Sequence, residues 1–159
     1  MPGIVGIISK GSIRENASEL RRMMDCMMHE SFYTSGTYVN ERMGLWIGWV
    51  NRSGSFTDCM PVWHENKNVC LIFSGENFAD RSETDYLRAR GHKFNPQNAS
   101  YLVHLYEEDG LKFFEKLNGR FSGVLVDLRR QNIILFNDRY GSDRLYYHER
   151  DGGIYFSSE

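Results

Sequence analysis

The residue at the amino terminus raises the first question about chemistry in this chain. The sequence begins Met1-Pro2-Gly3-Ile4-Val5, a turn of small residues that leads directly into an apolar strand. Proline carries no side-chain nucleophile. Removal of Met1 would expose the secondary amine of Pro2 as a base or nucleophile, whereas a retained Met1 would block it. Because a base also needs an arranged partner within hydrogen-bond reach, an enzyme that uses the Pro2 amine is kept only as an alternative.

The cysteines and histidines of the chain form no recognisable motif. The cysteines are Cys26, Cys59 and Cys70, and their separations match no metal-binding pattern. An odd cysteine count without a signal peptide favours free thiols in a reducing compartment. The histidines share no common spacing and are His29, His64, His92, His104 and His148. We therefore expect no metal site, with each histidine either satisfied within the fold or exposed.

Length and composition favour one folded domain. The chain has 159 residues, of which 41% are hydrophobic and 14% aromatic, and its formal net charge is −2. These values are those of a domain with a real core and exclude a disordered chain or a strongly basic nucleic-acid-binding protein. No apolar run approaches the roughly 20 residues of a membrane-spanning helix. We expect a cytoplasmic protein with neither nucleic acid nor membrane as a partner.

Hydrophobic periodicity predicts strands, then helices, then more strands. Predicted strands cover residues 4–8, 43–50, 69–73, 121–127, 132–137, 144–148 and 154–157. Capping-box spacing predicts helices that begin at Ser12 and Ser82, and two further helices are expected over residues 99–108 and 111–117. One face of the first helix is expected to join the core through Ala17, Leu20, Met24, Met27 and Met28. The periodicity alone predicts a mixed α+β domain.

Seven sequence blocks occur in an order that is typical of one enzyme family. They are Ser74-Gly75-Glu76-Asn77, Gly91-His92-Lys93-Phe94, residues 104–110, 117–127 and 134–141, Leu145-Tyr146-Tyr147, and residues 155–159. In these blocks the chain resembles the amino-terminal glutaminase domain of asparagine synthetase B-type enzymes, which are class II glutamine amidotransferases. The resemblance extends over residues 1–159, which we expect to form a single glutaminase-like domain. It implies the four-layer αββα sandwich of the N-terminal-nucleophile (Ntn) hydrolases.

The resemblance also implies that the catalytic residues have changed. Active relatives carry a cysteine after the initiator Met, whose thiol is the nucleophile and whose α-amine is the base, but this chain has Pro2. The family's Asn-Gly-Glu oxyanion motif corresponds to Ser74, Gly75 and Glu76. Gly75 retains a backbone N–H donor, whereas the asparagine amide is lost. Loss of one such donor typically costs about 10²–10³ in rate.

The groups that bind glutamine in the family differ as well. Trp49 stands where relatives have the arginine that binds the substrate carboxylate, and Asn98 stands where they have the aspartate that binds the ammonium. The degenerate pocket is thus expected to include Trp49, Ser74, Gly75, Glu76 and Asn98. An aromatic plug is expected from Phe32, Tyr33, Trp46 and Trp49, with a remodelled pocket for another small ligand as the alternative. The motif that begins at Asp138 and Arg139 is expected to form a buried ion pair in a turn.

These departures from the family pattern predict a catalytically degenerate glutaminase-like domain with a structural role. It would form the amino-terminal half of an ATP-dependent, asparagine synthetase-like amide ligase and would not hydrolyse glutamine itself. The expected partner is the carboxy-terminal synthetase domain, or the same domain on a separate chain, and a homodimer is left open. We expect no cofactor in residues 1–159, because ATP and Mg²⁺ would bind only in the synthetase domain. A regulatory domain that binds a small ligand is the alternative.

Overall fold

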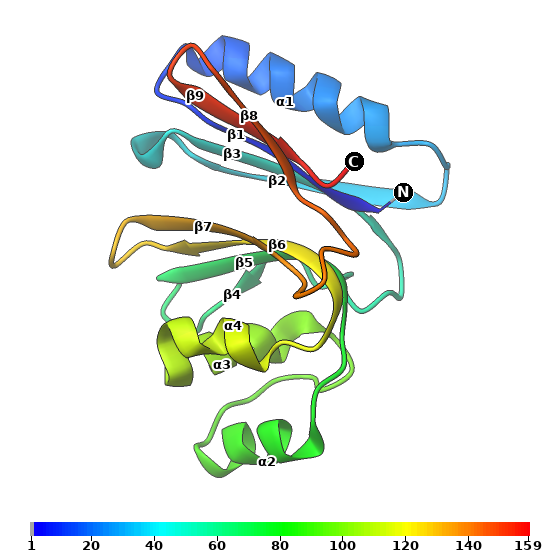
Figure 1. The fold of residues 1–159 in the computed structure, drawn as a ribbon, viewed down its shortest axis with the longest axis vertical. Helices are drawn as coiled ribbons and strands as arrows, with labels where there is room; N and C mark the ends of the chain where they lie inside the picture. Colours follow the sequence, from blue (N-terminus) through cyan, green and yellow to red (C-terminus); the bar gives the residue numbers. More distant parts are fainter. Residues whose placement is uncertain (1) are drawn as a thin grey trace.

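The computed structural model describes residues 2–159 and arranges them in four layers (Figure 1). Helix α1 (Ile13–Met27) covers the outer face of one sheet, and a second sheet packs against the opposite face of the first. Helices α2 (Arg81–Ala89), α3 (Leu102–Asp109) and α4 (Phe113–Lys116) lie beyond the second sheet. This order of helix, sheet, sheet and helices is the αββα sandwich predicted from the resemblance.

Both sheets are built from antiparallel pairs. The first has the strand order β2-β3-β1-β9-β8, with β2 Tyr33–Asn40, β3 Leu45–Arg52, β1 Gly3–Ile8, β9 Gly153–Ser157 and β8 Tyr146–Arg150. The second has the order β4-β5-β6-β7, with β4 Val62–Trp63, β5 Val69–Asn77, β6 Gly119–Asp127 and β7 Asn132–Asn137. Three short 3-10 segments, Glu41–Met43, Ala99–Tyr101 and Gly110–Lys112, complete the described structure. The inner strands β3 and β1 of the first sheet, and β5 and β6 of the second, are buried along most of their length.

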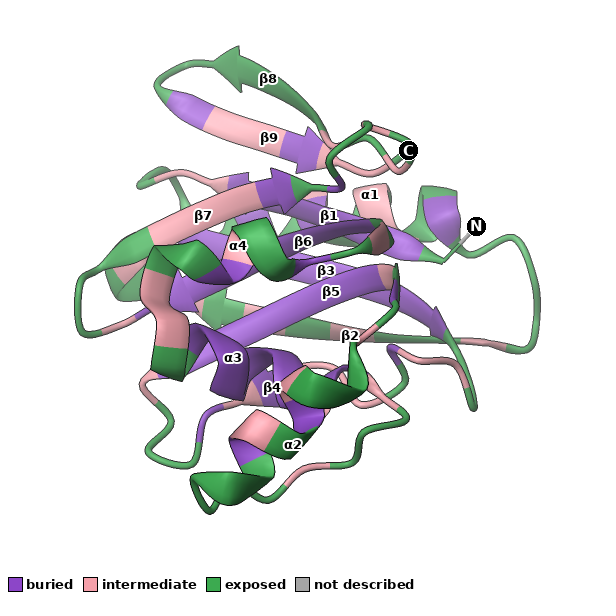
Figure 2. Cartoon of the chain, turned by 60° about the horizontal axis from the view of Figure 1, so that its bottom comes forward, coloured by how far each residue is buried: buried purple, intermediate pink, exposed green. Residues whose placement is uncertain are grey.

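Strand β3 shows how its sequence alternation builds two cores. Leu45, Ile47 and Trp49 point toward the second sheet and join the core between the sheets. Trp46 and Val50 point the other way and pack under α1. Both faces of β3 are packed against another layer of the fold, and both therefore carry apolar side chains. As a result, the sequence of β3 is a nearly continuous hydrophobic run. Figure 2 shows the contrast with β8, which lies at the sheet edge and is exposed along its length.

The helix boundaries confirm part of the sequence prediction. Ser12 caps α1, and its hydroxyl accepts a hydrogen bond from the backbone N–H of Glu15 at 3.4 Å. The predicted cap at Ser82 is wrong, because Asp80 caps α2 and its carboxylate accepts from the Ser82 N–H at 2.8 Å. Leu20 and Met27 are buried as expected. Ala17 and Met28 are exposed instead, and Asn16 and Met23 complete the packed face.

Two strands were missed and two predicted helices are shorter than expected. Strand β2 lacks a continuous apolar face because it lies at a sheet edge, and β4 has only two residues. The 99–108 helix begins as a 3-10 segment, and the 111–117 helix divides into a 3-10 segment and the single turn of α4. Propensity and periodicity do not separate these tight turns from regular α-helix.

Asp127 at the end of β6 connects this strand to helix α3. Its carboxylate is fully buried and accepts hydrogen bonds from the Tyr106 hydroxyl at 3.1 Å and from the Arg129 guanidinium at 3.0 and 3.1 Å. The backbone N–H groups of Arg129 and Arg130 also donate to it. Burial alone would raise the pKa of Asp127, but these hydrogen bonds outweigh burial and hold the pKa below its ordinary value.

We predict that Asp127→Asn lowers the free energy of unfolding at pH 7 by about 2 kcal/mol. The folded-state pKa is depressed, so the contribution of the ionised carboxylate is present above the unfolded pKa of about 3.9 and is lost as pH falls through the folded value. The difference from wild type should therefore shrink between pH 7 and pH 3 in urea unfolding. Asp151→Asn is the control, because that side chain is 87% exposed. An equal deficit at both pH values would contradict the assignment.

Candidate functional site

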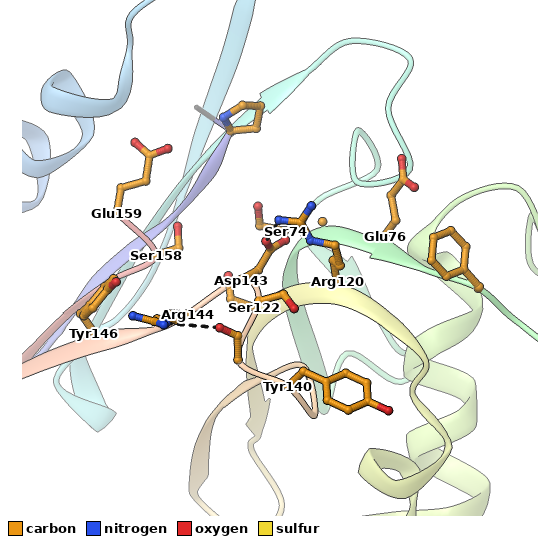
Figure 3. Close-up of a pocket in the computed structure, with 15 residues that line it drawn as sticks. Ser74, Glu76, Arg120, Ser122, Tyr140, Asp143, Arg144, Tyr146, Ser158 and Glu159 are labelled. Carbon is orange, nitrogen blue, oxygen red and sulfur yellow. Dashed lines mark hydrogen bonds and ion pairs between the residues drawn. The ribbon is translucent and has the colours of Figure 1, made fainter.

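A cavity of about 950 Å³ opens where the ends of both sheets meet the chain termini (Figure 3). It lies at the end of β5 and the start of β6, beside the loop that follows β7. The lining residues are Pro2, Ser74, Gly75, Glu76, Phe78, Arg120, Ser122, Tyr140, Gly141, Ser142, Asp143, Arg144, Tyr146, Ser158 and Glu159. Pro2, Ser74, Gly75 and Glu76, which were predicted as site residues, are therefore brought together.

The pairing of the first and last strands places Pro2 at this cavity. Strand β1 pairs antiparallel with β9, so the two ends of the described chain lie close together (Figure 1). The backbone N–H of Ile4 donates to Ser158 Oγ at 2.9 Å, and the N–H of Ser158 donates to the Ile4 carbonyl at 2.9 Å. This reciprocal pair fixes the chain directly after Pro2. The position of Pro2 is thus a consequence of sheet pairing.

Gly75 is required by the backbone at the end of β5. Its φ is +108°, and a Cβ at this position would lie 2.1 Å from the Arg120 carbonyl oxygen on the paired strand β6. Only glycine fits such a close approach at this φ. The same register places Glu76 opposite Arg120, whose guanidinium donates to Asp143 at 2.9 Å. The presence of Gly75 is therefore explained by strand pairing as well as by any role in binding.

Asp138 organises the loop that forms one wall of the cavity. Its carboxylate is 3% exposed and accepts hydrogen bonds from the backbone N–H groups of Tyr140, Ser142 and Asp143 at 3.0, 3.0 and 2.7 Å. Burial alone would raise the pKa of Asp138, but these donors hold it below its ordinary value. The predicted buried ion pair is wrong, because Arg139 is exposed and donates to the Glu115 carbonyl at 3.3 Å. Backbone amides, rather than a guanidinium, compensate the buried charge.

Trp49 and Asn98 lie outside the lining of the cavity. Trp49 is 5% exposed and belongs to the core between the sheets. Its indole lies over Gly36, where a Cβ would come within 2.4 Å of the ring. Asn98 caps the 3-10 segment Ala99–Tyr101, and its side chain accepts from the Ser100 N–H at 3.0 Å. The structure therefore gives both residues structural roles in packing and capping.

The expected aromatic plug of four residues is not present. Trp46 packs under α1 on the opposite face of β3 from Trp49, and Phe32 is 55% exposed. Tyr33 is partly buried against the same cluster as Trp46. The prediction is wrong because side chains alternate between the two faces of a strand. Trp46 and Trp49 are three positions apart in β3, so they point to opposite faces and join different cores.

The chemistry of the cavity wall is polar and charged. The charged lining residues are Glu76, Arg120, Asp143, Arg144 and Glu159, and serines supply hydroxyl groups. Among the lining residues that the structure describes there is neither cysteine nor histidine. The serine hydroxyls consequently lack the imidazole base that usually activates such a nucleophile. These groups fit recognition of a polar ligand better than covalent catalysis.

Sequence reasoning missed the loop and the β6 residues of the cavity. Arg120, Ser122, Asp143 and Arg144 all line it, yet none was predicted as a site residue. The block of residues 134–141 was noted only as a structural motif. The buried Asp138 holds a turn that brings the residues after it to the cavity. An aspartate at the start of a predicted turn is the sequence signal that could have been used to find them.

We predict that Asp138→Asn loosens this wall of the cavity. The variant retains the shape of the side chain but loses its negative charge. In the wild type this charge strengthens the hydrogen bonds from the three backbone donors. Hydrogen exchange at Tyr140, Ser142 and Asp143 should accelerate by at least about tenfold at pH 7, while the β5 amides keep their protection. Asp151→Asn should leave the exchange unchanged. Unaltered protection of the three amides in Asp138→Asn would contradict this role.

Comparisons with known proteins agree with this architecture. A family model described as a glutamine amidotransferase domain matches residues 52–159. The solved structure of glutamine phosphoribosylpyrophosphate amidotransferase from Bacillus subtilis, complexed with ADP and GMP, superposes with a TM-score of 0.73 at 13% identity. The superposition covers 99% of this chain and 42% of that one. It confirms the predicted αββα fold of the N-terminal-nucleophile type.

The curated relatives of this chain include several asparagine synthetases. Asparagine synthetase [glutamine-hydrolyzing] from Triphysaria versicolor is 36% identical over 103 residues, and asparagine synthetase 3 from Arabidopsis thaliana is 32% identical over 101 residues. Both matches cover 62% of this chain and 17% of the relative. Asparagine synthetase 2 from Bacillus subtilis is 24% identical across the whole chain, which spans 22% of that relative. The chain thus belongs to the glutamine amidotransferase domain family and is related to the amino-terminal domain of asparagine synthetases.

Proposed function

We propose that this domain has lost glutamine hydrolysis and serves as a structural part of an asparagine synthetase-like, ATP-dependent amide ligase. The observation that carries the proposal is the presence of Pro2 in the cavity wall, at the position where the resemblance implies a catalytic cysteine. A proline side chain has no thiol or hydroxyl. The step that would form a covalent acyl intermediate therefore has no nucleophile at this position.

The cysteines of the chain do not replace the missing thiol. Cys26 is exposed on α1, Cys59 is partly buried in a loop, and Cys70 is buried in the core between the sheets. Burial raises the pKa of Cys70 to about 12, so its sulfur stays protonated and unreactive at neutral pH. None of the three belongs to the cavity lining. Each is therefore an unsuitable nucleophile for a ligand in the cavity.

Loss of the substrate contacts supports the same proposal. The position of the carboxylate-binding arginine holds Trp49, whose buried indole fills space between the sheets. A neutral Asn98 caps a short helical segment instead of offering a carboxylate to an ammonium group. A change of nucleophile alone would leave glutamine binding intact. Changes in both binding groups point to the loss of recognition as well as of chemistry.

The surface of the domain supports a role in contact with a larger protein. The curated relatives are several times longer than this chain, which spans 17 to 22% of them. Aromatic side chains surround the cavity opening, where Phe78 is 61%, Tyr140 85% and Tyr146 54% exposed. Exposed aromatic groups that gather in one place are typical of interaction surfaces. In this proposal the synthetase domain contacts this rim and supplies the sites for ATP and Mg²⁺.

A regulatory role in binding a small ligand is the second candidate. It is favoured by the open cavity of about 950 Å³, whose wall carries Arg120, Arg144 and three carboxylates. A mixed set of this kind would suit a polar ligand with charges of both signs. Of the residues expected to line such a pocket, Ser74 does so, whereas Trp49 and Asn98 do not.

We predict that the wild-type protein and its Pro2→Cys variant release no ammonia from glutamine above a Pro2→Ala control. The Pro2→Cys substitution supplies a thiol nucleophile. It restores neither the asparagine amide that stabilises the oxyanion nor the arginine that binds the substrate carboxylate. The assay is ammonia release coupled to a dehydrogenase, with folding of each variant checked by circular dichroism. Turnover by the wild type would overturn the proposal. Turnover by Pro2→Cys at about 1 s⁻¹ or faster would show that the binding groups are still competent.

A further inference from the structure

Three histidines and two glutamates gather on the side of the second sheet that faces the helices, away from the cavity. His64 follows strand β4, His92 follows α2, and His104, Glu107 and Glu108 belong to α3. The ring centroids of His92 and His104 are 4.8 Å apart, and those of His64 and His104 are 6.1 Å apart. Residues that share no spacing in sequence are thus brought together by the fold.

Two members of this cluster are buried deeply. His64 and His104 are each 4% exposed, while the Glu107 side chain is 31% exposed at the edge of the cluster. One ligand atom from each of these three residues lies within 4.8 Å of the other two. His104 and Glu107 are three positions apart on α3 and so project from the same face. His92 Nε2 lies 2.8 Å from Glu108 Oε1, and its Nδ1 lies 3.8 Å from Glu107 Oε2.

The region contains polar atoms that lack hydrogen-bond partners. Among residues 2–159, the buried side-chain atoms without a partner are His104 Nδ1 and Asn68 Oδ1. Asn68 lies in the turn that joins β4 to β5, the same turn that carries His64. A buried ring nitrogen without a hydrogen-bond partner is available to bind a ligand.

We propose that His64, His104 and Glu107 form a binding site for one divalent transition-metal ion of the Zn²⁺ type. Two imidazoles and one carboxylate are a known zinc ligand set, and a water molecule would complete the tetrahedron. Nitrogen ligands favour Zn²⁺ over Mg²⁺ or Ca²⁺, which prefer oxygen. The ion would tie the β4–β5 turn to helix α3. None of the three ligands belongs to the cavity lining.

The hydrogen bonds of His64 define what must change when the ion enters. His64 Nδ1 accepts from the backbone N–H of Asn66 at 3.2 Å, so the ring proton resides on Nε2, 2.6 Å from Glu107 Oε2. The ion takes the place of this proton, and the two ligand atoms separate to about 3.3 Å. The proton moves to Nδ1, with no net release from this ring. The N–H of Asn66, an exposed residue, then turns to water.

Zinc titration of the full chain after chelator treatment tests this proposal. We expect one Zn²⁺ per chain by calorimetry, and about tenfold or greater weakening in Glu107→Gln and His104→Asn. The ¹⁵N–¹H signal of Asn66 should shift on binding. Glu107→Gln keeps the test valid if His104→Asn fails to fold, because Glu107 is partly exposed. His148→Gln is the matched control, since His148 is exposed on β8 outside the cluster.

Cobalt provides an independent measure of geometry. Substitution by Co²⁺ should give the intense visible absorption of a tetrahedral site in wild type and not in Glu107→Gln. Absence of stoichiometric binding would overturn the proposal. Binding that survives Glu107→Gln unchanged, or that falls equally in His148→Gln, would also overturn it, because either result describes adventitious surface binding.

Discussion

The contact between the inner faces of the two sheets is the constraint on which the rest of this structure depends. Ile4 of β1, Ile47 and Trp49 of β3, and Ile72 of β5 meet in one buried cluster between the sheets. Removing such side chains from water supplies roughly 1.5–3 kcal/mol each. The packing holds the start of β1 beside the end of β5 and the start of β6. The cavity and the position of Pro2 in its wall are consequences of this arrangement.

The same packing holds the fold together without any contribution from catalytic groups. The indole of Trp49 fills space between the sheets and rests on Gly36, where no side chain could fit. Gly75 is needed for the close approach of β5 to β6 and would be kept whether or not the site is active. Asp138 holds its loop through backbone amides, which is independent of any ligand. Gly75 and Asp138 are therefore residues that the architecture itself requires.

Much of the fold could be predicted from the sequence, because strands such as β5 and β6 are apolar runs and Ser12 marks the start of α1. The edge strand β2 and the two-residue β4 could not, since partial exposure and short length leave little pattern. Pro2 and the segment Ser74–Glu76 of β5 were found by resemblance. Arg120 and Asp143 come together only through the β5–β6 register and the Asp138 loop. The His64, His104 and Glu107 cluster was missed for the same reason, because tertiary packing alone joins its members.

The central claim is that the cavity has lost recognition of glutamine together with the nucleophile. Isothermal titration calorimetry of the wild-type chain with L-glutamine tests this most directly, because binding is measured without any need for turnover. The account predicts no saturable heat at millimolar glutamine. Stoichiometric binding, abolished by substitution of a cavity residue such as Arg120→Ala, would contradict it and would make the domain a glutamine sensor.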